Sequence, residues 1–299
     1  MGSAREILRN KTEGSGRRKP EWLRVPLPVG TSYRRMKELL KKNSLNTVCE
    51  SAACPNRGEC WSRSTATIMI LGDVCTRSCG FCNVKTGRPG EIDRQEPERV
   101  AEAVATMGLA HAVITSVNRD ELPDGGASVW AQTIRAVRRR CPQTRIEVLI
   151  PDFCGNWEAL GLVIEAEPDV LNHNVETVPR LYRRVRPQGK LSRSLELLER
   201  AKLAGLTTKS GFMVGLGESD QEVFALLDSL QAAQVDMVTI GQYLQPTGLH
   251  LPVECWVTPE TFAHYRGYGL RLGFKNVFSG PLVRSSYHAE EQAAFASRR

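Results

Sequence analysis

The chain has 299 residues, of which 41% are hydrophobic and 24% are charged, and its formal net charge is +7. These proportions are typical of a globular protein and exclude collagen-like, largely disordered and coiled-coil chains. No apolar run approaches the roughly 20 residues of a membrane-spanning helix, and the first ten residues lack the apolar stretch of a secretory signal. We therefore expect a cytoplasmic protein with no membrane partner.

The positive charge is concentrated near the N-terminus. Residues 1–42 contain twelve Lys or Arg and four Glu, whereas the rest of the chain is nearly neutral. Residues 1–30 are rich in Gly, Arg, Lys and Pro, which predicts an extended arm, and residues 32–42 follow as a short basic helix. Such an arm is either a solvated surface or a docking site for an acidic partner. Because no zinc-finger or RNA-recognition signature accompanies it, we expect no nucleic-acid partner.

Six of the nine cysteines lie in two short segments of three each. The segment CESAACPNRGEC (residues 49–60) has the spacing CxxxxCxxxxxC and contains Pro55 and Gly58, so we expect an irregular loop there. The segment CTRSCGFC (residues 75–82) has the spacing CxxxCxxC. The remaining cysteines fit no ligand spacing and are interpreted as plain thiols: Cys141, Cys154 and Cys255.

From residue 66 to residue 280, apolar β-branched runs alternate with segments of helical period. Strands that are buried on both faces and joined by helices predict a parallel α/β sheet. Six such units, without a dinucleotide-binding glycine motif after the first strand, favour a partial (β/α)6 barrel of the TIM type. Ser219 and Glu222 predict a capping box at the start of the last helix. The six predicted strands occupy residues 67–71, 111–116, 145–150, 169–174, 207–214 and 236–242, and the helices occupy residues 97–108, 127–140, 156–166, 177–184, 191–205 and 219–234.

Polar side chains crowd the carboxyl ends of these predicted strands, which is the end where a parallel barrel carries its reaction site. The first strand, at residues 67–71, runs directly into the second cysteine segment. We therefore place that segment at the mouth of the barrel.

Groups of three cysteines restrict the kind of metal site. A structural zinc site takes four ligands, and a disulfide framework favours an even number of cysteines and an oxidising compartment. A four-iron cluster held by three thiolates, in contrast, leaves one iron free to bind a substrate or cofactor. Structural metal binding and ordinary buried thiols remain the simpler alternatives.

The segment CTRSCGFC resembles the cluster loop of radical S-adenosylmethionine enzymes, which use a full or partial α/β barrel. The resemblance implies a four-iron, four-sulfur cluster whose open iron binds the amino and carboxylate groups of S-adenosylmethionine. One electron then cleaves the sulfonium and gives a 5′-deoxyadenosyl radical, which can take hydrogen from an unactivated carbon. The residues implied to hold this cluster are Cys75, Cys79 and Cys82.

The first cysteine segment is similar to the auxiliary-cluster signature of the lipoyl synthase family. Further segments agree with that family over roughly residues 21–290: ITSVNRDELPDGGA, HNVETVPRLY, GLGES, IGQYLQPT and GPLVRSSYHA. The resemblance implies insertion of two sulfur atoms at C6 and C8 of an octanoyl chain attached to a lysine of a lipoyl carrier domain. The sulfur donor would be a second four-iron, four-sulfur cluster held by Cys49, Cys54, Cys60 and the serine of the RSSY motif, Ser286.

The same resemblance suggests contacts to S-adenosylmethionine beyond the cysteines. For GLGES a plain turn is an equal alternative, and His173 and Asn174 can instead satisfy backbone groups at the barrel rim. For Arg284 the two alternatives are positioning of the auxiliary cluster and pairing with a carboxylate, and the first is slightly favoured. The implied cofactor-binding residues are Phe81, Thr115, Ser116, Asn118, His173, Asn174, Gly215, Gly217 and Glu218.

The implied partners are octanoylated lipoyl domains of 2-oxoacid dehydrogenase E2 subunits, the glycine-cleavage H protein, an electron donor such as ferredoxin or flavodoxin, and iron–sulfur cluster assembly or carrier proteins. Three regions follow: an arm with the auxiliary-cluster loop at residues 1–65, the barrel at 66–280 and the RSSY segment at 281–299. Two alternatives remain open. One is a radical enzyme that inserts sulfur into a small molecule, and the other is a non-catalytic iron–sulfur electron carrier.

Overall fold

The structure is a computed structural model that describes residues 11–13, 19–25, 30–62 and 65–296. Within these residues the main sheet has eight strands in the order β12-β10-β9-β8-β7-β6-β3-β2. The short strand β2 (Asn46–Thr47) is antiparallel to its neighbour, and the other strands run parallel. The parallel strands are β3 (Thr67–Ile70), β6 (His111–Ser116), β7 (Arg145–Leu149), β8 (Val170–Asn172), β9 (Thr207–Val214), β10 (Met237–Gln242) and β12 (Asn276–Gly280).

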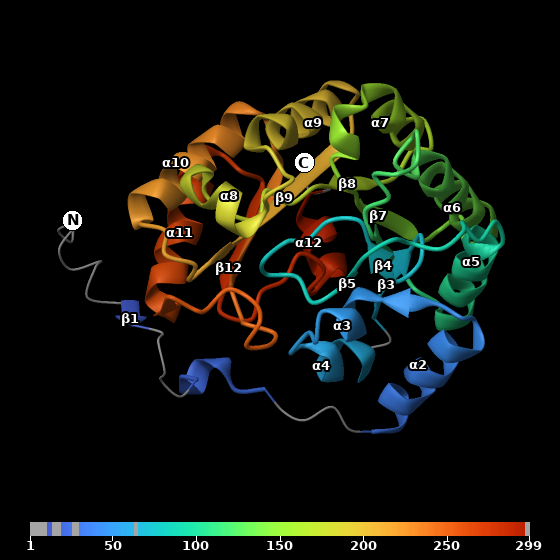
Figure 1. Ribbon diagram of the computed structural model, residues 1–299, viewed down its shortest axis with the longest axis horizontal. Coiled ribbons are helices and arrows are strands. Elements are labelled where there is room, and N and C mark those ends of the chain that lie inside the picture. The colour runs from blue at the N-terminus through green and yellow to red at the C-terminus, as the bar shows by residue number, and fades with distance from the viewer. Residues whose placement is uncertain (1–10, 14–18, 26–29, 63–64, 297–299) are drawn as a thin grey trace.

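This sheet curves around an interior and helices surround it on the outside, which confirms the predicted partial barrel (Figure 1). The six predicted strands are present, and β12 extends the parallel sheet beyond them. Its sequence NVFSG contains Asn, Ser and Gly, which have weak strand propensity, so the pattern did not reveal it. Pairing along its whole length with β10 fixes it as a strand.

The crossover helices lie where the helical periods predict them. The capping box is confirmed, because the Glu222 amide donates to Ser219 Oγ (3.3 Å) and the Ser219 amide donates to Glu222 Oε2 (2.8 Å). The segment at residues 177–184 forms only a short turn of 3-10 helix, η4 (Pro179–Leu181), and α8 (Tyr182–Val185). The long helices are α5 (Glu96–Met107), α6 (Ala127–Arg140), α7 (Trp157–Ile164), α9 (Leu191–Leu203), α10 (Asp220–Ala232) and α11 (Pro259–Leu272).

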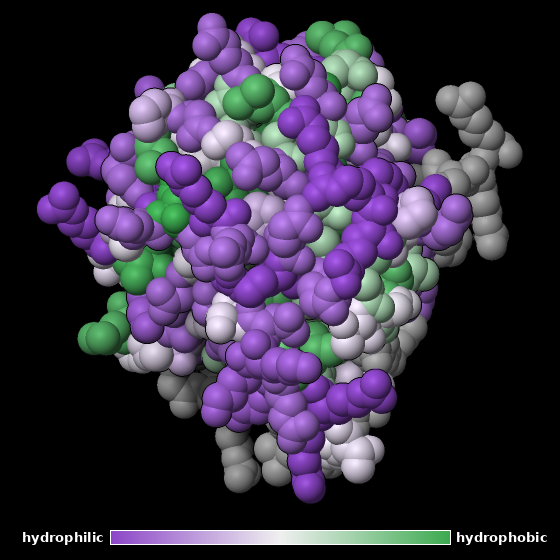
Figure 2. Space-filling model, turned by 90° about the vertical axis from the view of Figure 1, so that its right-hand side faces the viewer, coloured by the Kyte–Doolittle hydropathy of each residue, from purple (hydrophilic) through white to green (hydrophobic). Residues whose placement is uncertain are grey.

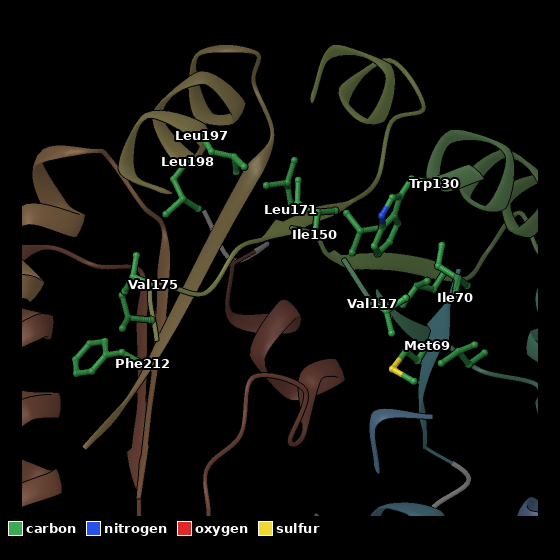
Figure 3. Close-up of a cluster of buried hydrophobic side chains, with 14 of the residues drawn as sticks. Met69, Ile70, Val117, Trp130, Ile150, Leu171, Val175, Leu197, Leu198 and Phe212 are labelled. Atoms are coloured by element: carbon green, nitrogen blue, oxygen red, sulfur yellow. The ribbon is translucent and has the colours of Figure 1, made fainter. Parts of the chain in front are cut away.

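The hydrophobic core lies between these helices and the sheet. Figure 3 shows Trp130 of α6 and Leu197 and Leu198 of α9 pointing at the strands, and all three are fully buried. Burying one such side chain contributes about 1.5–3 kcal/mol. The outer face that Figure 2 shows is mostly hydrophilic, as expected when the apolar faces of the helices turn inward. No described helix is both long enough and apolar enough to span a membrane.

The first cysteine segment is more regular than its sequence suggested, so the prediction of an irregular loop was wrong. It contains two short helices, α3 (Val48–Ser51) and α4 (Arg57–Ser62). The Thr47 hydroxyl caps α3 by accepting the Glu50 amide (3.3 Å). Pro55 lies before α4, where its missing N–H breaks no helical bond.

The N-terminal region contributes to the barrel but is described only in part. The predicted basic helix is present as α2 (Thr31–Lys42), and β1 (Lys11–Glu13) pairs antiparallel with β11 (Cys255–Val257). Most of the predicted extended arm falls on residues 1–10, 14–18 and 26–29, which lie outside the described residues. Strand β2 precedes the predicted boundary after residue 65 and yet belongs to the main sheet. That boundary stays a prediction.

The C-terminal segment runs through the interior of the barrel. In Figure 1, α12 (Ala289–Ala296) lies within the ring of strands, where it contacts β12 and β6. A glycine of β10 allows residues 281–288 to lie close against the sheet. A Cβ atom at Gly241 would overlap the Val283 carbonyl oxygen.

Replacing Gly241 with Ala should therefore lower the free energy of unfolding of the cluster-free chain by about 1–3 kcal/mol, because the added methyl group meets backbone. Urea denaturation followed by circular dichroism measures the change. Gly161→Ala is the matched control, since Gly161 lies inside α7 with open space around it. That control should gain up to about 1 kcal/mol from helix propensity. A Gly241→Ala chain as stable as the parent would contradict the close approach.

Candidate active site

The second cysteine segment lies across the mouth of the barrel, as predicted. After β3 the chain turns at Leu71, whose φ is +68°, and enters the short parallel pair β4 (Val74–Cys75) and β5 (Lys85–Thr86). The middle of the segment is held from two sides. The Gly80 amide donates to the Val185 carbonyl (2.9 Å), and the Gly80 carbonyl accepts the Leu251 amide (3.0 Å).

The three thiols of this segment lie near one another in a poorly solvated place. Burial raises the pKa of Cys79 to about 12 and that of Cys82 to about 11, and neighbouring thiols add to both increases. The Cys75 sulfur already accepts two backbone N–H groups, from Arg77 (3.4 Å) and Asn118 (3.3 Å). Thiols in such a place lose their protons together only when a cationic group binds them.

This geometry fits an iron–sulfur cluster better than a single metal ion. Within the described residues, no three His, Cys, Asp or Glu side chains converge on one ion. In a four-iron cluster each thiolate binds a different iron, so the sulfurs stand further apart. Backbone N–H groups aimed at a ligand sulfur are also a usual means of tuning such clusters.

An ion-pair network fixes the segment between its first two cysteines. The side chain of Arg77 is 1% exposed and pairs with Asp120 (2.6 Å) and with Asp152 (2.6 Å), whose side chain is fully buried. Asp152 also pairs with Arg193 at 3.1 Å. The exposed Cys154 joins this network, with its sulfur 3.2 Å from Arg77 Nη2. This network links the cluster segment to the ends of β6 and β7.

Two of the predicted cofactor residues carry buried polar atoms without a partner among the described residues, Ser116 Oγ and Asn118 Oδ1. A buried polar atom without a hydrogen bond is costly, so a polar ligand beside it restores the lost bond. The hydroxyl of Thr115, in contrast, already donates to the Leu149 carbonyl (3.0 Å). Phe81 packs against the edge of the hydrophobic core.

His173 is engaged by the protein at both ring nitrogens. Nδ1 lies 2.8 Å from the Ile150 carbonyl oxygen, and Nε2 lies 2.9 Å from Ser194 Oγ. Burial and the Arg186 charge lower its pKa to about 4, so the ring is neutral. The imidazole therefore positions barrel elements, and a direct cofactor contact stays a prediction.

Asn174 and the GLGES turn also have partners within the protein. The Asn174 side chain exchanges hydrogen bonds with Ser285 Oγ at 2.8 and 3.0 Å. The Glu218 carboxylate accepts the amides of Gly215 (2.6 Å) and Leu216 (2.9 Å), which closes the turn before α10. The approach of Gly215, Gly217 and Glu218 to S-adenosylmethionine stays a prediction, and the Glu218 carboxylate is already bound.

Sequence reasoning missed two charged residues beside the cysteines. Arg186 is buried, its charge lowers the pKa of Cys79, and its Nη1 donates to the Asn174 carbonyl (2.9 Å). Glu176 lies near enough to raise the pKa of both Cys79 and Cys82. Glu176 belongs to the motif HNVETVPRLY, of which only His173 and Asn174 are predicted above as cofactor-binding residues.

The first cysteine segment and the RSSY motif meet at a small cavity, separate from the second cysteine segment. The Thr67 hydroxyl at the start of β3 donates to Ser286 Oγ at 2.7 Å, which holds that serine at the cavity wall. All three cysteines of the first segment line the cavity together with the serine. Its lining residues are Cys49, Cys54, Asn56, Arg57, Cys60, Thr65, Ala66, Thr67, Arg284, Ser286 and Tyr287.

Two arginines supply positive charge to this cavity. The pKa of Arg284 is lowered, because the effect of burial exceeds the opposing effect of the Cys54 thiol. No carboxylate of a described residue lies within ion-pair distance of the Arg284 guanidinium. Arg57 sits over the rings of Tyr33 (5.8 Å) and Trp61 (5.7 Å), and its buried Nε has no hydrogen-bond partner in the described chain. Partly buried cations of this kind fit an anionic group such as a thiolate-bound cluster.

Further hydrogen bonds join residues 49–60 to residues 282–288 around the cavity. The Asn56 side chain donates to the Leu282 carbonyl at 2.7 Å. The Glu59 carboxylate accepts the Tyr287 hydroxyl (3.0 Å) and lies 3.0 Å from His288 Nε2. The cavity is therefore complete only when residues 49–60 and 282–288 are assembled.

The neutral state of His173 predicts an acid-sensitive fold. Its folded pKa of about 4 lies below the 6.5 of an unfolded histidine, so the unfolded chain binds more protons between these values. The stabilisation is complete above about pH 6.5 and is lost as the pH falls toward 4, by about 3 kcal/mol in total. Urea denaturation of the cluster-free chain across this range measures it.

His173→Gln should flatten this pH dependence, whereas substitution of the exposed His264 should leave it unchanged. An identical pH profile for His173→Gln and the parent would contradict the neutral assignment.

Comparisons with solved structures agree on the fold. The chain superposes on methylornithine synthase with a TM-score of 0.54, at 16% identity, over 69% of this chain and 61% of that one. It superposes on SuiB of Streptococcus suis, in a crystal structure bound to S-adenosylmethionine, with a TM-score of 0.57, at 11% identity, over 83% of this chain and 54% of that one. The chain thus spans less than two thirds of either structure, and the likeness concerns the barrel.

Sequence comparisons identify the family. The model of the radical SAM superfamily matches residues 69–230, and the model of the N-terminal domain of lipoyl synthase matches residues 4–54. The lipoyl synthase of Rubrobacter xylanophilus is 58% identical over 99% of this chain and 93% of its own length. The mitochondrial lipoyl synthase of Nematostella vectensis is 56% identical over 91% and 94%. The chain belongs to the lipoyl synthase family of the radical S-adenosylmethionine superfamily.

Proposed function

We propose that the chain is a lipoyl synthase that inserts two sulfur atoms, at C6 and C8, into an octanoyl chain carried on a lysine of a lipoyl carrier protein. The observation that carries the proposal is the pair of three-thiol sites on one barrel, the second of which includes a serine from the C-terminal segment. Near-full-length identity to curated lipoyl synthases supports it. The cofactors are two four-iron, four-sulfur clusters and S-adenosylmethionine.

The two sites have different tasks in this proposal. When bound, one cluster supplies the electron that cleaves S-adenosylmethionine to a 5′-deoxyadenosyl radical, and the other supplies the sulfur. The site at the barrel mouth is held by Cys75, Cys79 and Cys82. The sulfur-donor site is held by Cys49, Cys54, Cys60 and Ser286.

At the mouth of the barrel, the chain's own residues orient the reactants. Arg77 fixes the segment between the first two cysteines through its ion pairs with Asp120 and Asp152. Ser116 Oγ and Asn118 Oδ1, which lack partners among the described residues, can hydrogen-bond the polar groups of the methionine moiety. Such positioning matters because a radical abstracts hydrogen only from a carbon held close to it.

At the second site, Ser286 would supply an oxygen as the fourth ligand of a bound cluster. A serine oxygen is a harder ligand than a thiolate and matches cluster iron less well, so it would hold that iron less firmly than a fourth thiolate. Thr67 donates a hydrogen bond to this oxygen and keeps it aimed into the cavity. Arg284 and Arg57 stabilise the anionic ligand set.

Several partners follow from this function. A lipoyl synthase acts on lipoyl carrier proteins. We assign to this chain the lipoyl domains of 2-oxoacid dehydrogenase E2 subunits and the glycine-cleavage H protein as substrates. Ferredoxin or flavodoxin would supply electrons, and cluster assembly or carrier proteins would rebuild the consumed site.

The decisive experiment compares products from two sets of variants after anaerobic cluster reconstitution. The assay contains S-adenosylmethionine, a reductant and an octanoyl-lysine peptide, and products are followed by mass. The parent should form lipoyl peptide with about two 5′-deoxyadenosine molecules per peptide, one for each C–H bond broken. Replacing Cys75, Cys79 and Cys82 with Ala should abolish both products. Replacing Cys49, Cys54 and Cys60 with Ala should abolish the lipoyl product and leave 5′-deoxyadenosine formation.

The same assay separates the alternatives. Deoxyadenosine without thiolation by the parent would favour a radical enzyme that acts on a small molecule. Formation of neither product would favour an electron carrier and would overturn the proposal.

Replacing Ser286 with Cys tests the role of the oxygen ligand. A fourth thiolate should hold the auxiliary iron more firmly, so the yield of lipoyl product should fall while 5′-deoxyadenosine formation persists. Ser286→Ala, which removes the oxygen without adding a thiol, is the control that separates loss of the oxygen ligand from gain of a thiolate. A product yield in Ser286→Cys equal to that of the parent would contradict the idea that oxygen ligation eases sulfur release.

A further inference from the structure

A buried chain of polar side chains crosses the barrel interior and ends on the C-terminal segment. Lys209 of β9 is completely buried, and its Nζ donates to Glu147 Oε1 of β7 (2.8 Å) and to the carbonyl oxygen of Ser285 (2.5 Å). On its other side Glu147 Oε2 lies 3.2 Å from His111 Nε2 of β6. Asn172 of β8 donates to Glu147 Oε1 at 3.0 Å.

Charge balance alone does not explain this arrangement. Two buried charges cost several kcal/mol to desolvate, and a well-packed apolar pair of similar volume is often as stable or more stable. Burial raises the pKa of Glu147, but the Lys209 charge and the hydrogen bond with His111 lower it to about 2, so the carboxylate is ionised. The additional partner of the lysine is a backbone carbonyl 76 residues further along the chain. The bond to this carbonyl indicates that Lys209 has a role beyond its ion pair with Glu147.

The contacts around Ser285 show what this lysine controls. The carbonyl of Ser285 is fixed by Lys209 and its hydroxyl by Asn174, at the end of β8. The next residue along the chain, Ser286, is bound by Thr67 of β3, and strands β6, β7 and β8 separate β3 from β9 in the sheet order. The RSSY motif is thus tied to β3 and β9, which lie on different sides of the barrel in Figure 1.

We propose that Lys209 is a positioning residue that holds the Ser285 carbonyl so that the neighbouring Ser286 hydroxyl reaches the cavity lined by Cys49, Cys54 and Cys60. The inference rests on the proposed function, in which Ser286 is the oxygen ligand of the auxiliary site. Glu147 orients the ammonium group, and His111 and Asn172 orient the carboxylate. Loss of the lysine donor frees the Ser285 carbonyl, and the serine ligand then engages iron less completely.

The test isolates the auxiliary site in a chain whose Cys75, Cys79 and Cys82 are replaced by Ala, so that only one cluster binds. Mössbauer spectroscopy of this background reports the iron that carries an oxygen ligand, and Ser286→Ala provides the spectrum without that ligand. Lys209→Met, which keeps the length of the side chain but removes its donors, should shift the spectrum toward that of Ser286→Ala. Release of iron to a chelator should become roughly 10–100-fold faster, as for other losses of support around metal ligands.

Two further variants separate positioning from a purely structural role. Lys209→Met combined with Glu147→Gln removes both charges, and it should show the same spectral shift as Lys209→Met alone because the carbonyl still lacks its donor. Lys202→Met breaks another ion pair, between Lys202 and Asp236 (2.8 Å), which does not touch the C-terminal segment. It should retain the parent spectrum and release rate.

Four outcomes would overturn the inference. They are a parent spectrum in Lys209→Met, recovery of the parent spectrum in the double variant, the same shift in Lys202→Met, and a double variant that does not fold. A Ser286→Ala spectrum identical to the parent would overturn the inference together with the ligand assignment. Failure of the parent chain, which keeps Cys75, Cys79 and Cys82, to form lipoyl product while the spectra of the auxiliary site behave as expected would count against the proposed function alone.

Discussion

The site depends on one constraint: a single cavity must be assembled from the two ends of the chain. Asn56 and Leu282, and Thr67 and Ser286, form hydrogen bonds across more than two hundred residues of sequence. Contacts between residues so far apart in sequence cost much chain entropy, so they stabilise the fold only after the intervening barrel has formed. The barrel therefore serves as the frame that brings the two halves of the cavity together, and the order of assembly follows from this.

Positive charge inside the protein is the second consequence of that design. Arg186 is buried and Arg284 is partly buried beside the two groups of cysteines, and Arg284 has no carboxylate partner among the described residues. A buried cation without an anion is unfavourable, whereas a cation beside thiolate-bound iron is compensated. Cluster binding and folding are thus linked, and removal of the auxiliary cluster leaves Arg284 beside neutral thiols.

Local pattern was enough to predict much of the frame. Apolar β-branched runs marked six parallel strands, helical period marked the crossovers, and Ser219 with Glu222 marked the helix start. Elements that depend on distant partners were missed. Strand β12 has weak propensity and is fixed by pairing with β10. Helix α3 was missed for a different reason, because its cap from Thr47 is a local signal that was outweighed by Pro55 and Gly58. The partners of the His173 ring, the Ile150 carbonyl and the Ser194 hydroxyl, come from other segments of the chain and could not be predicted from local sequence.

The candidate site shows the same limit at the level of single residues. Cysteine spacing indicated two groups of three, but Ser286 came only from family resemblance, because nothing in its local sequence points at residues 49–60. The residues that place Ser286 at the cavity also carry no recognisable signal in the sequence. Gly241 admits the C-terminal segment, and the Lys209 ammonium group donates to the backbone of that segment. A ligand brought from far along the chain is specified by the surfaces that its backbone crosses, so its prediction requires the fold first.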